Sequence, residues 1–363
     1  MCPEVTFRRD RKLHAWVCLW LVIAFGLGEV AVRMLASTEE PELIVPSAND
    51  QLVYELNAQR SGINSFGMRG EEFALEDLHG KYVIVVIGDS HTYSSKVEQA
   101  SGAFPQQLER HLSRLARRGQ VAVLNMGVLG YNTAQELEVL RAKALQFSPN
   151  LVILQYCIND THVCNYLQPE HQWLNRLVHK SHLLVLAWKG LLYSGWGQRH
   201  LMWRLGTRWP DTLLFQEGLV GTLSSNVEGE AEAHRHHPAR TKARVPARYH
   251  DMLGRENWER RTQEFAAICQ RATIPVIATG FIEEEDRAVF SRAGFTVYSF
   301  FDMIDRGDMA QYGYDPARTD SHFEADGSER IGRALAEFIS ARHGADIDEV
   351  GAKANARGAG HRK

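Results

Sequence analysis

The sequence predicts an α/β fold, a three-layer sandwich in which helices cover both faces of a central parallel sheet, preceded by one transmembrane helix. Continuous β-rich apolar runs, typical of strands buried on both faces of a parallel sheet, alternate along the chain with segments of helical periodicity. A single apolar run of about twenty residues, long enough to span a bilayer, lies close to the N-terminus.

Composition narrows the possible functions. A chain of 363 residues with 44% hydrophobic residues has room for one large domain or two small ones. The net charge of −3 argues against a nucleic-acid-binding protein, which usually carries a basic surplus. Five cysteines fit neither a disulfide scaffold nor a zinc pattern, and whether Cys157 and Cys164 form a disulfide stays open.

The N-terminal region predicts a membrane anchor over residues 13–35. Residues 13–32 are apolar apart from His14 and Glu29, and Glu29 lies near the far end, where a charge costs less than at the helix centre. The basic segment 1–12 should stay in the cytoplasm, so the rest of the protein should lie outside the inner membrane as a single-pass protein. The alternative is a cleaved signal peptide, but the run is longer than the usual apolar region of about 7–15 residues.

The rest of the chain is divided by composition. Residues 36–80 are interpreted as a connector, and residues 81–345 as the α/β domain. Within this domain, residues 166–256 lack a clear period and are interpreted as an insertion or lid. The tail, 346–363, is rich in Gly, Ala and basic residues and is expected to be disordered.

Strands and helices are predicted in alternation. The β-rich apolar runs predict strands at residues 82–87, 121–124, 151–156, 275–279 and 295–298. Apolar residues at helical spacing predict helices at residues 104–118, 133–147, 182–193, 257–271, 283–293 and 325–342. Gly119 suits the end of the first of these helices, and Pro149 ends the second.

Polar segments follow three of the predicted strands, and a fourth precedes the last helix. These segments are 88–91, 125–130, 158–160 and 320–322. Ligands of open α/β sheets bind at the carboxyl ends of the strands, so these segments are the candidate functional site.

The residue types at these positions suit acyl transfer. Ser90 leaves a strand through a glycine-containing turn, and His322 is the candidate base that removes its proton. Asp320 would hold the imidazole in the correct tautomer. The backbone N–H groups of Ser90 and Gly130 and the side-chain amide of Asn159 are candidate donors to the oxyanion of the tetrahedral intermediate.

Four sequence blocks carry a family resemblance. IGDSHT, NMGVLGYNTAQE, IND and DSHFEADG resemble, in order, the four blocks of the SGNH (GDSL-like) hydrolases, and residues 64–70 resemble the lead-in segment of membrane-anchored and secreted bacterial members. The resemblance implies a flavodoxin-like sheet and assigns Ser90 as nucleophile, Gly130 and Asn159 as oxyanion donors, and His322 as base. Many members carry the acid three residues before the histidine, where this chain has Thr319. Asp320 therefore takes the acid role, with two fallback candidates, Asp302 and Asp315.

The resemblance implies a serine esterase or acyl hydrolase without metal or organic cofactor. By analogy with the family, its substrate would be O-acyl, mainly acetyl, groups of a cell-envelope polysaccharide. An O-acyltransferase with the same triad and a lipid esterase are the alternatives, because both reactions pass through acyl-Ser90.

Two further function classes are disfavoured. A metal-dependent phosphoesterase would use Asp89, His91 and Asn159 together with residues 320–322, but no further ligands stand at strand ends. The histidines at 234, 236 and 237 lie in a charged irregular stretch and are interpreted as a solvated loop. A non-catalytic polysaccharide-assembly protein is disfavoured because every catalytic position is filled.

Overall fold

The computed structural model describes residues 11–36, 41–117, 119–167, 181–194, 220–221, 247–315 and 322–360. The chain forms two compact units. The anchor unit comprises residues 1–40 and 171–210, and the α/β unit comprises residues 41–170 and 211–363.

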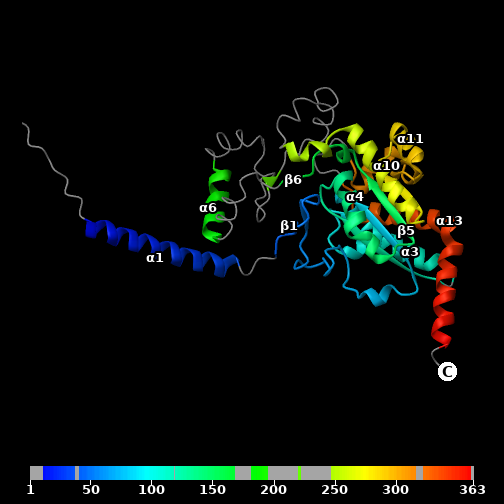
Figure 1. Ribbon diagram of the computed structural model, residues 1–363, viewed down its shortest axis with the longest axis horizontal. Helices are drawn as coiled ribbons and strands as arrows, with labels where there is room; N and C mark the ends of the chain where they lie inside the picture. The colour runs from blue at the N-terminus through cyan, green and yellow to red at the C-terminus, as the bar shows by residue number, and fades with distance from the viewer. Residues whose placement is uncertain are drawn as a thin grey trace, which may run out of the picture. The chain divides into compact units, whose positions relative to one another are not determined.

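The α/β unit is built on a five-stranded parallel sheet. Its order is β4-β3-β5-β8-β9, or 2-1-3-4-5 when these strands are numbered along the chain, which is the flavodoxin-like order. Figure 1 shows this unit with β5 labelled. The strands are β3 (Lys81–Gly88), β4 (Gln120–Gly127), β5 (Leu151–Tyr156), β8 (Val276–Gly280) and β9 (Thr296–Val297). The predicted fold class is therefore confirmed.

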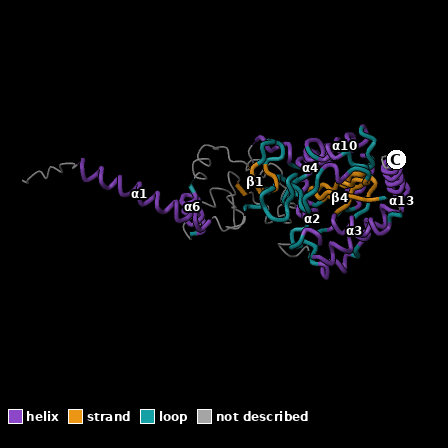
Figure 2. The backbone as a smooth tube through the Cα atoms, turned by 90° about the horizontal axis from the view of Figure 1, so that it is seen from below, coloured by secondary structure: helices purple, strands orange, loops and turns teal. Residues whose placement is uncertain are grey.

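Helices cover both faces of this sheet (Figure 2). One face packs against α4 (Thr133–Ala142), α10 (Arg255–Arg271) and α11 (Glu284–Ala293). The other packs against α3 (Phe104–Leu115), the short α12 (Phe300–Met303) and α13 (Ala325–Gly360). Alternate residues of β3 enter the two cores, which explains why residues 82–87 are all apolar.

Residues 41–80 belong to the α/β unit, so the interpretation of 36–80 as a connector is wrong for most of its length. Strands β1 (Ile44–Pro46) and β2 (Tyr54–Leu56) pair antiparallel, and a short 3₁₀ helix, η1 (Leu75–Leu78), follows. The physical reason is burial: this segment places several apolar side chains in the core on the α4 side, namely Ile44, Leu52, Tyr54, Leu56 and Met68.

The C-terminal helix is longer than the sequence predicts. Helix α13 continues to Gly360, so the expectation of disorder from residue 346 is wrong for residues 346–360. Ile347 is 1% exposed in the core formed with α3, and the backbone N–H of Arg117 donates to Asp348 Oδ1 at 3.1 Å. Tertiary contacts thus hold a segment whose composition alone suggests disorder.

The predicted insertion, 166–256, is described only in part. Strand β6 (Tyr166–Leu167) pairs with β7 (Val220–Gly221), and α6 (His182–Tyr193) belongs to the anchor unit. The 3₁₀ helix η7 (Ala247–Met252) buries Tyr249 and Met252 in the α/β core, so the boundary at 256 lies too far along the chain. The histidines at 234, 236 and 237 and most of the proposed lid lie outside the described residues.

The anchor unit begins with α1 (Arg11–Ala36). Within it, His14–Leu35 is long and apolar enough to cross a membrane, and none of it is buried inside the protein. A signal sequence near an N-terminus meets the same criteria, so the helix is compatible with either an anchor or a signal sequence.

Candidate active site

Ser90 stands at the start of a tight helical turn. β3 ends at Gly88, and the four-residue helix α2 (Ser90–Tyr93) begins after Asp89, whose side chain accepts a hydrogen bond from the His91 N–H at 2.9 Å. A Cβ on Gly88 would lie 2.3 Å from Thr92 Oγ1, so only glycine permits this close return of the chain. The turn presents Ser90 at the carboxyl edge of the sheet, where the sequence predicts it.

His322 lies beside Ser90. The distance between Ser90 Oγ and His322 Nε2 is 2.8 Å, although 232 residues separate them along the chain. His322 precedes α13, so the packing of this helix on the sheet and on α3 brings the imidazole to the strand ends. If Nδ1 carries the proton, Nε2 accepts from the serine hydroxyl, which is the arrangement that a base requires.

His91 stacks on His322, a contact that the sequence does not reveal. The two ring centroids are 4.5 Å apart with an interplanar angle of 26°, and Phe281 contacts His91 edge-on at 4.8 Å. Burial, followed by the charge of His322, lowers the pKa of His91 well below its usual value. His91 is therefore a neutral aromatic neighbour of the candidate base.

Gly130 has a positive φ of 67°, which strongly favours glycine. A Cβ at this position would lie 2.1 Å from Asn165 Cγ, so the site is also too crowded for a side chain. The Gly130 carbonyl accepts from the Asn165 N–H at 3.2 Å. The loop after β4 is thereby held against the loop that follows β5.

Asn159 reaches the same loop. It lies in a 3₁₀ turn, η4 (Ile158–Thr161), after β5, and its Nδ2 donates to the carbonyl oxygen of Tyr131 at 3.2 Å. An amide nitrogen has two N–H donors, and the Asn159 side chain also hydrogen-bonds to the Asp89 side chain. The structure thus brings Ser90 next to His322 and Asn159 next to the Gly130 loop.

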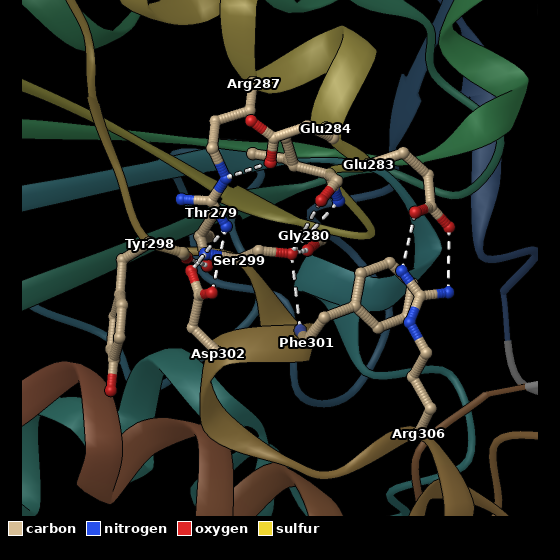
Figure 3. Close-up of polar contacts among 11 residues, drawn as sticks. Thr279, Gly280, Glu283, Glu284, Arg287, Tyr298, Ser299, Phe301, Asp302 and Arg306 are labelled. Carbon is tan, nitrogen blue, oxygen red and sulfur yellow. Dashed lines mark hydrogen bonds and ion pairs between the residues drawn. The ribbon is translucent and has the colours of Figure 1, made fainter.

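The predicted acid, Asp320, lies outside the described residues, as do residues 316–321 in general. The fallback candidate Asp302 has other partners (Figure 3): its carboxylate accepts from Arg287 Nη2 at 2.8 and 2.9 Å and from the Ser299 N–H at 2.8 Å. This carboxylate caps α12 and pairs with α11, which counts against it as the third member of the triad. Asp315 is described, and its assignment as a fallback stays a prediction.

Among the residues that the structure describes, neither the cysteines nor the metal-ligating groups form a further site. Cys157, Cys164 and Cys269 are free thiols, so Cys157 and Cys164 are not joined. The described ranges contain no cluster of three or more His, Cys, Asp or Glu side chains that suits a metal ion.

The sequence of this chain matches the model of a known protein family. The GDSL-like lipase/acylhydrolase family matches residues 86–330, which include Ser90, Gly130, Asn159 and His322. The chain belongs to this family. No curated protein matches the chain.

Solved structures similar to the chain include several hydrolases. A lipase/acylhydrolase from Enterococcus faecalis is 13% identical with a TM-score of 0.37, covering 72% of this chain and 96% of its own. The esterase EstA from Pseudoalteromonas sp. is 10% identical with a TM-score of 0.39, covering 72% and 97%. A catalytic mutant of an acetylxylan esterase from Geobacillus stearothermophilus is 12% identical with a TM-score of 0.36, covering 71% and 94%.

Arg69, from the lead-in segment at residues 64–70, is a buried clamp on the chain that follows Ser90. Its guanidinium donates to the carbonyl oxygens of Ser94 at 2.8 Å and Glu98 at 3.1 Å, and also to those of Tyr93 and Val97. It lies 4.3 Å from the centroid of the Tyr93 ring. The family resemblance singles out this segment, but only the structure shows what the arginine holds.

We expect Arg69→Lys to lower kcat by about 10²-fold with little change in KM, because a small displacement of a catalytic turn has effects of this size. Lysine keeps the charge but cannot reproduce the planar fork that reaches several carbonyl groups. Kinetics on p-nitrophenyl acetate test this, with Arg60→Lys as the control, since Arg60 is exposed and donates to Pro41 O from a loop. A lower melting temperature with unchanged kcat would show that the clamp is only structural.

An acidic cluster is buried beneath the site. Burial raises the pKa of Glu136 well above its usual value, and the nearby charges of Asp160 and Asp89 add to this shift. Burial and Asp89 raise the pKa of Asp160 in the same direction. Neither carboxyl oxygen of Glu136 has a hydrogen-bond partner within the described part of the chain. Burial therefore favours the protonated form of Glu136.

This shift predicts a pH-dependent stability. A carboxyl group with a raised folded-state pKa contributes stability below its unfolded pKa, about 4.3, and this contribution is lost as pH rises toward the folded value. Glu136→Gln removes the cost of ionising a buried carboxyl group. The melting temperature of this variant should therefore fall less than that of the wild type between pH 4 and pH 8. Glu337→Gln, at an exposed position on α13, serves as the control. If the melting temperatures of the wild type and Glu136→Gln changed equally with pH, the raised pKa of Glu136 would be contradicted.

Proposed function

We propose that the protein is a serine esterase that acts through an acyl-Ser90 intermediate. The observation that carries the proposal is the 2.8 Å contact between Ser90 Oγ and His322 Nε2 at the carboxyl edge of the sheet. This edge is where α/β sheets of the flavodoxin-like order bind ligands.

The steps follow from the positions of these groups. His322 Nε2 takes the hydroxyl proton as Ser90 Oγ attacks the ester carbonyl carbon. The tetrahedral intermediate carries an oxyanion, for which we assign the N–H groups of Ser90 and Gly130 and the side-chain amide of Asn159 as donors. His322 then returns the proton to the leaving alcohol. Water, deprotonated by His322, attacks the carbonyl carbon of acyl-Ser90. The bond to Ser90 Oγ then breaks, His322 returns the proton to Ser90 Oγ, and the acid is released.

The surroundings of His322 favour this cycle. The imidazole becomes positive in each half-reaction, and a positive neighbour would oppose that change. His91, stacked against it, stays neutral because it is buried. We assign Asp320, two residues before His322, as the carboxylate that stabilises the imidazolium.

We propose O-acyl, chiefly acetyl, groups of a cell-envelope polysaccharide as the substrate. The support is the apolar α1, which would hold the enzyme at the inner membrane with its catalytic unit outside the cytoplasm. An O-acyltransferase would use the same acyl-Ser90 but pass the acyl group to a sugar hydroxyl. Acylated lipid is the other candidate substrate.

One assay separates these possibilities. Release of acetate and of p-nitrophenol from p-nitrophenyl acetate is measured with and without an envelope polysaccharide. A hydrolase releases both products in equal amounts in each case. A transferase releases less acetate when polysaccharide is present and acetylates the polysaccharide. Preference for long-chain p-nitrophenyl esters would point to lipid, and absence of p-nitrophenol release from every ester would contradict the esterase proposal.

The topology is tested separately. The basic segment 1–12 should stay in the cytoplasm, so a protease added to intact spheroplasts should digest the catalytic unit. A cytoplasmic protein, which must stay intact, serves as the control for leakage. Full protection of the catalytic unit would reverse the proposed orientation.

A further inference from the structure

Glu29 is the only acidic residue in the apolar run at residues 13–32. An ionisable residue inside a membrane-spanning helix is expensive and usually has a specific partner. A position sixteen residues after Leu13 lies about 24 Å along the helix, near the outer rim of a hydrocarbon core about 30 Å thick. Glu29 therefore stands at the outer edge of the predicted membrane span.

Glu29 accepts a hydrogen bond from Arg33 Nε at 2.7 Å one turn along α1, and it also contacts the start of α6. Figure 1 shows α6 beside the C-terminal part of α1. The Glu29 carboxylate accepts hydrogen bonds from Ser181 Oγ at 2.7 Å and from the N–H groups of His182 and Leu183, both at 3.0 Å. The N–H groups at the start of a helix have no acceptor within the helix, and a carboxylate there also opposes the helix dipole. Glu29 thus acts as the cap of a helix that lies more than 150 residues away along the chain.

The two helices also pack closely at this point. A Cβ placed on Gly28 would lie 3.1 Å from Leu183 Cδ2, so the leucine side chain rests against the α1 backbone. The glycine lets the two backbones approach, as small residues do where membrane helices meet. Apolar contact and carboxylate cap therefore fix α6 to the outer end of α1.

The composition of α6 suits a membrane surface. The segment HLLVLAWKGLLY has twelve residues, about 18 Å of helix, which is too short to cross a bilayer. It is apolar apart from His182 and Lys189, and Leu184 and Leu186 are 37% and 56% exposed. Tryptophan and tyrosine, both present in it, are enriched where a membrane meets water.

We propose that α6 is a second membrane-binding element, a helix that lies in the outer interface of the bilayer and is fixed to the anchor by Glu29. We propose lipid as the molecule that contacts α6, because Leu184 and Leu186 are exposed on a helix that packs against the apolar α1. The inference rests on the proposed retention of α1 as an anchor. The consequence is that α6, although it falls within the predicted insertion, serves membrane attachment rather than substrate selection.

Lipid cross-linking tests the proposal without relying on enzyme activity. A photo-crosslinking phenylalanine analogue replaces Leu186 of α6, Leu21 of α1 or Leu115 of α3 in full-length protein, reconstituted into phosphatidylcholine vesicles that carry a tagged lipid. All three leucines have exposed side chains, and Leu115 lies on the α/β unit. We expect tagged lipid on the Leu186 and Leu21 probes and none on the Leu115 probe.

The outcomes separate the two ideas. Labelling at Leu21 without labelling at Leu186 would overturn the α6 proposal and leave the anchor standing. Absence of labelling at Leu21 would overturn the anchor, and the α6 proposal with it, but would not touch the esterase proposal. Glu29→Ala should lower the labelling at Leu186 several-fold and leave that at Leu21 unchanged. Unchanged labelling at Leu186 would show that Glu29 does not hold α6.

Discussion

Ser90→Ala is expected to abolish ester hydrolysis, with a loss in kcat of about 10⁶-fold, the size seen when a serine nucleophile is removed from a hydrolase. The fold should persist, because Ser90 is the first residue of a short helical turn and its hydroxyl contacts His322 rather than the core. Turnover of p-nitrophenyl acetate and the melting temperature measure the two effects.

Ser95→Ala provides a matched control from the same turn. Its hydroxyl donates to the Ser90 carbonyl oxygen at 3.1 Å, and the residue is exposed, so activity should stay within a few-fold of the wild type. A phosphonofluoridate should label Ser90 covalently, because His322 activates its hydroxyl as a nucleophile. Folded, pure Ser90→Ala protein with wild-type activity would defeat the proposed mechanism.

Asp320→Asn is expected to lower kcat by up to about 10⁴-fold. An asparagine would favour the wrong imidazole tautomer and leave the imidazolium without its counter-charge. Asp302→Asn is the matched control: it should reduce the melting temperature, because Asp302 pairs with Arg287 and caps α12, but should change kcat little. Asp315→Asn should also be mild. A severe loss of kcat in Asp302→Asn with none in Asp320→Asn would reassign the acid.

Much of the fold follows from the sequence because its strands are buried on both faces. Such strands are apolar at almost every position, with Lys81 and Gln155 as the polar exceptions, so β3 and β5 stand out in the sequence. Their bounds agree with the prediction to within a residue. The polar turns at their carboxyl ends are equally visible. Because parallel strands end at one edge, the sequence alone is enough to group Ser90, Gly130 and Asn159.

Other features depend on partners that are distant in sequence. In the sequence, Ile347 is an isolated apolar residue in a Gly- and Ala-rich tail. In the structure it is buried in the core that includes α3, and this burial explains why α13 continues past it. Arg69 donates its hydrogen bonds to main-chain carbonyl oxygens. Every residue has such a group, so the sequence does not indicate which ones the arginine contacts. The stacking of His91 on His322 likewise depends on where the last helix begins.

The interior position of β3, between β4 and β5, has a consequence for how the enzyme loses activity under denaturing conditions. All eight residues of β3 pair with β4, and four of them also pair with β5, whereas β9 at the edge has only two residues. In native-state hydrogen exchange, amides of β9 should exchange through local fraying, and those of β3 only through global opening. The turn that carries Ser90 follows β3 directly, and β3 is expected to exchange most slowly. Inactivation by urea should therefore coincide with loss of the whole α/β unit, rather than precede it.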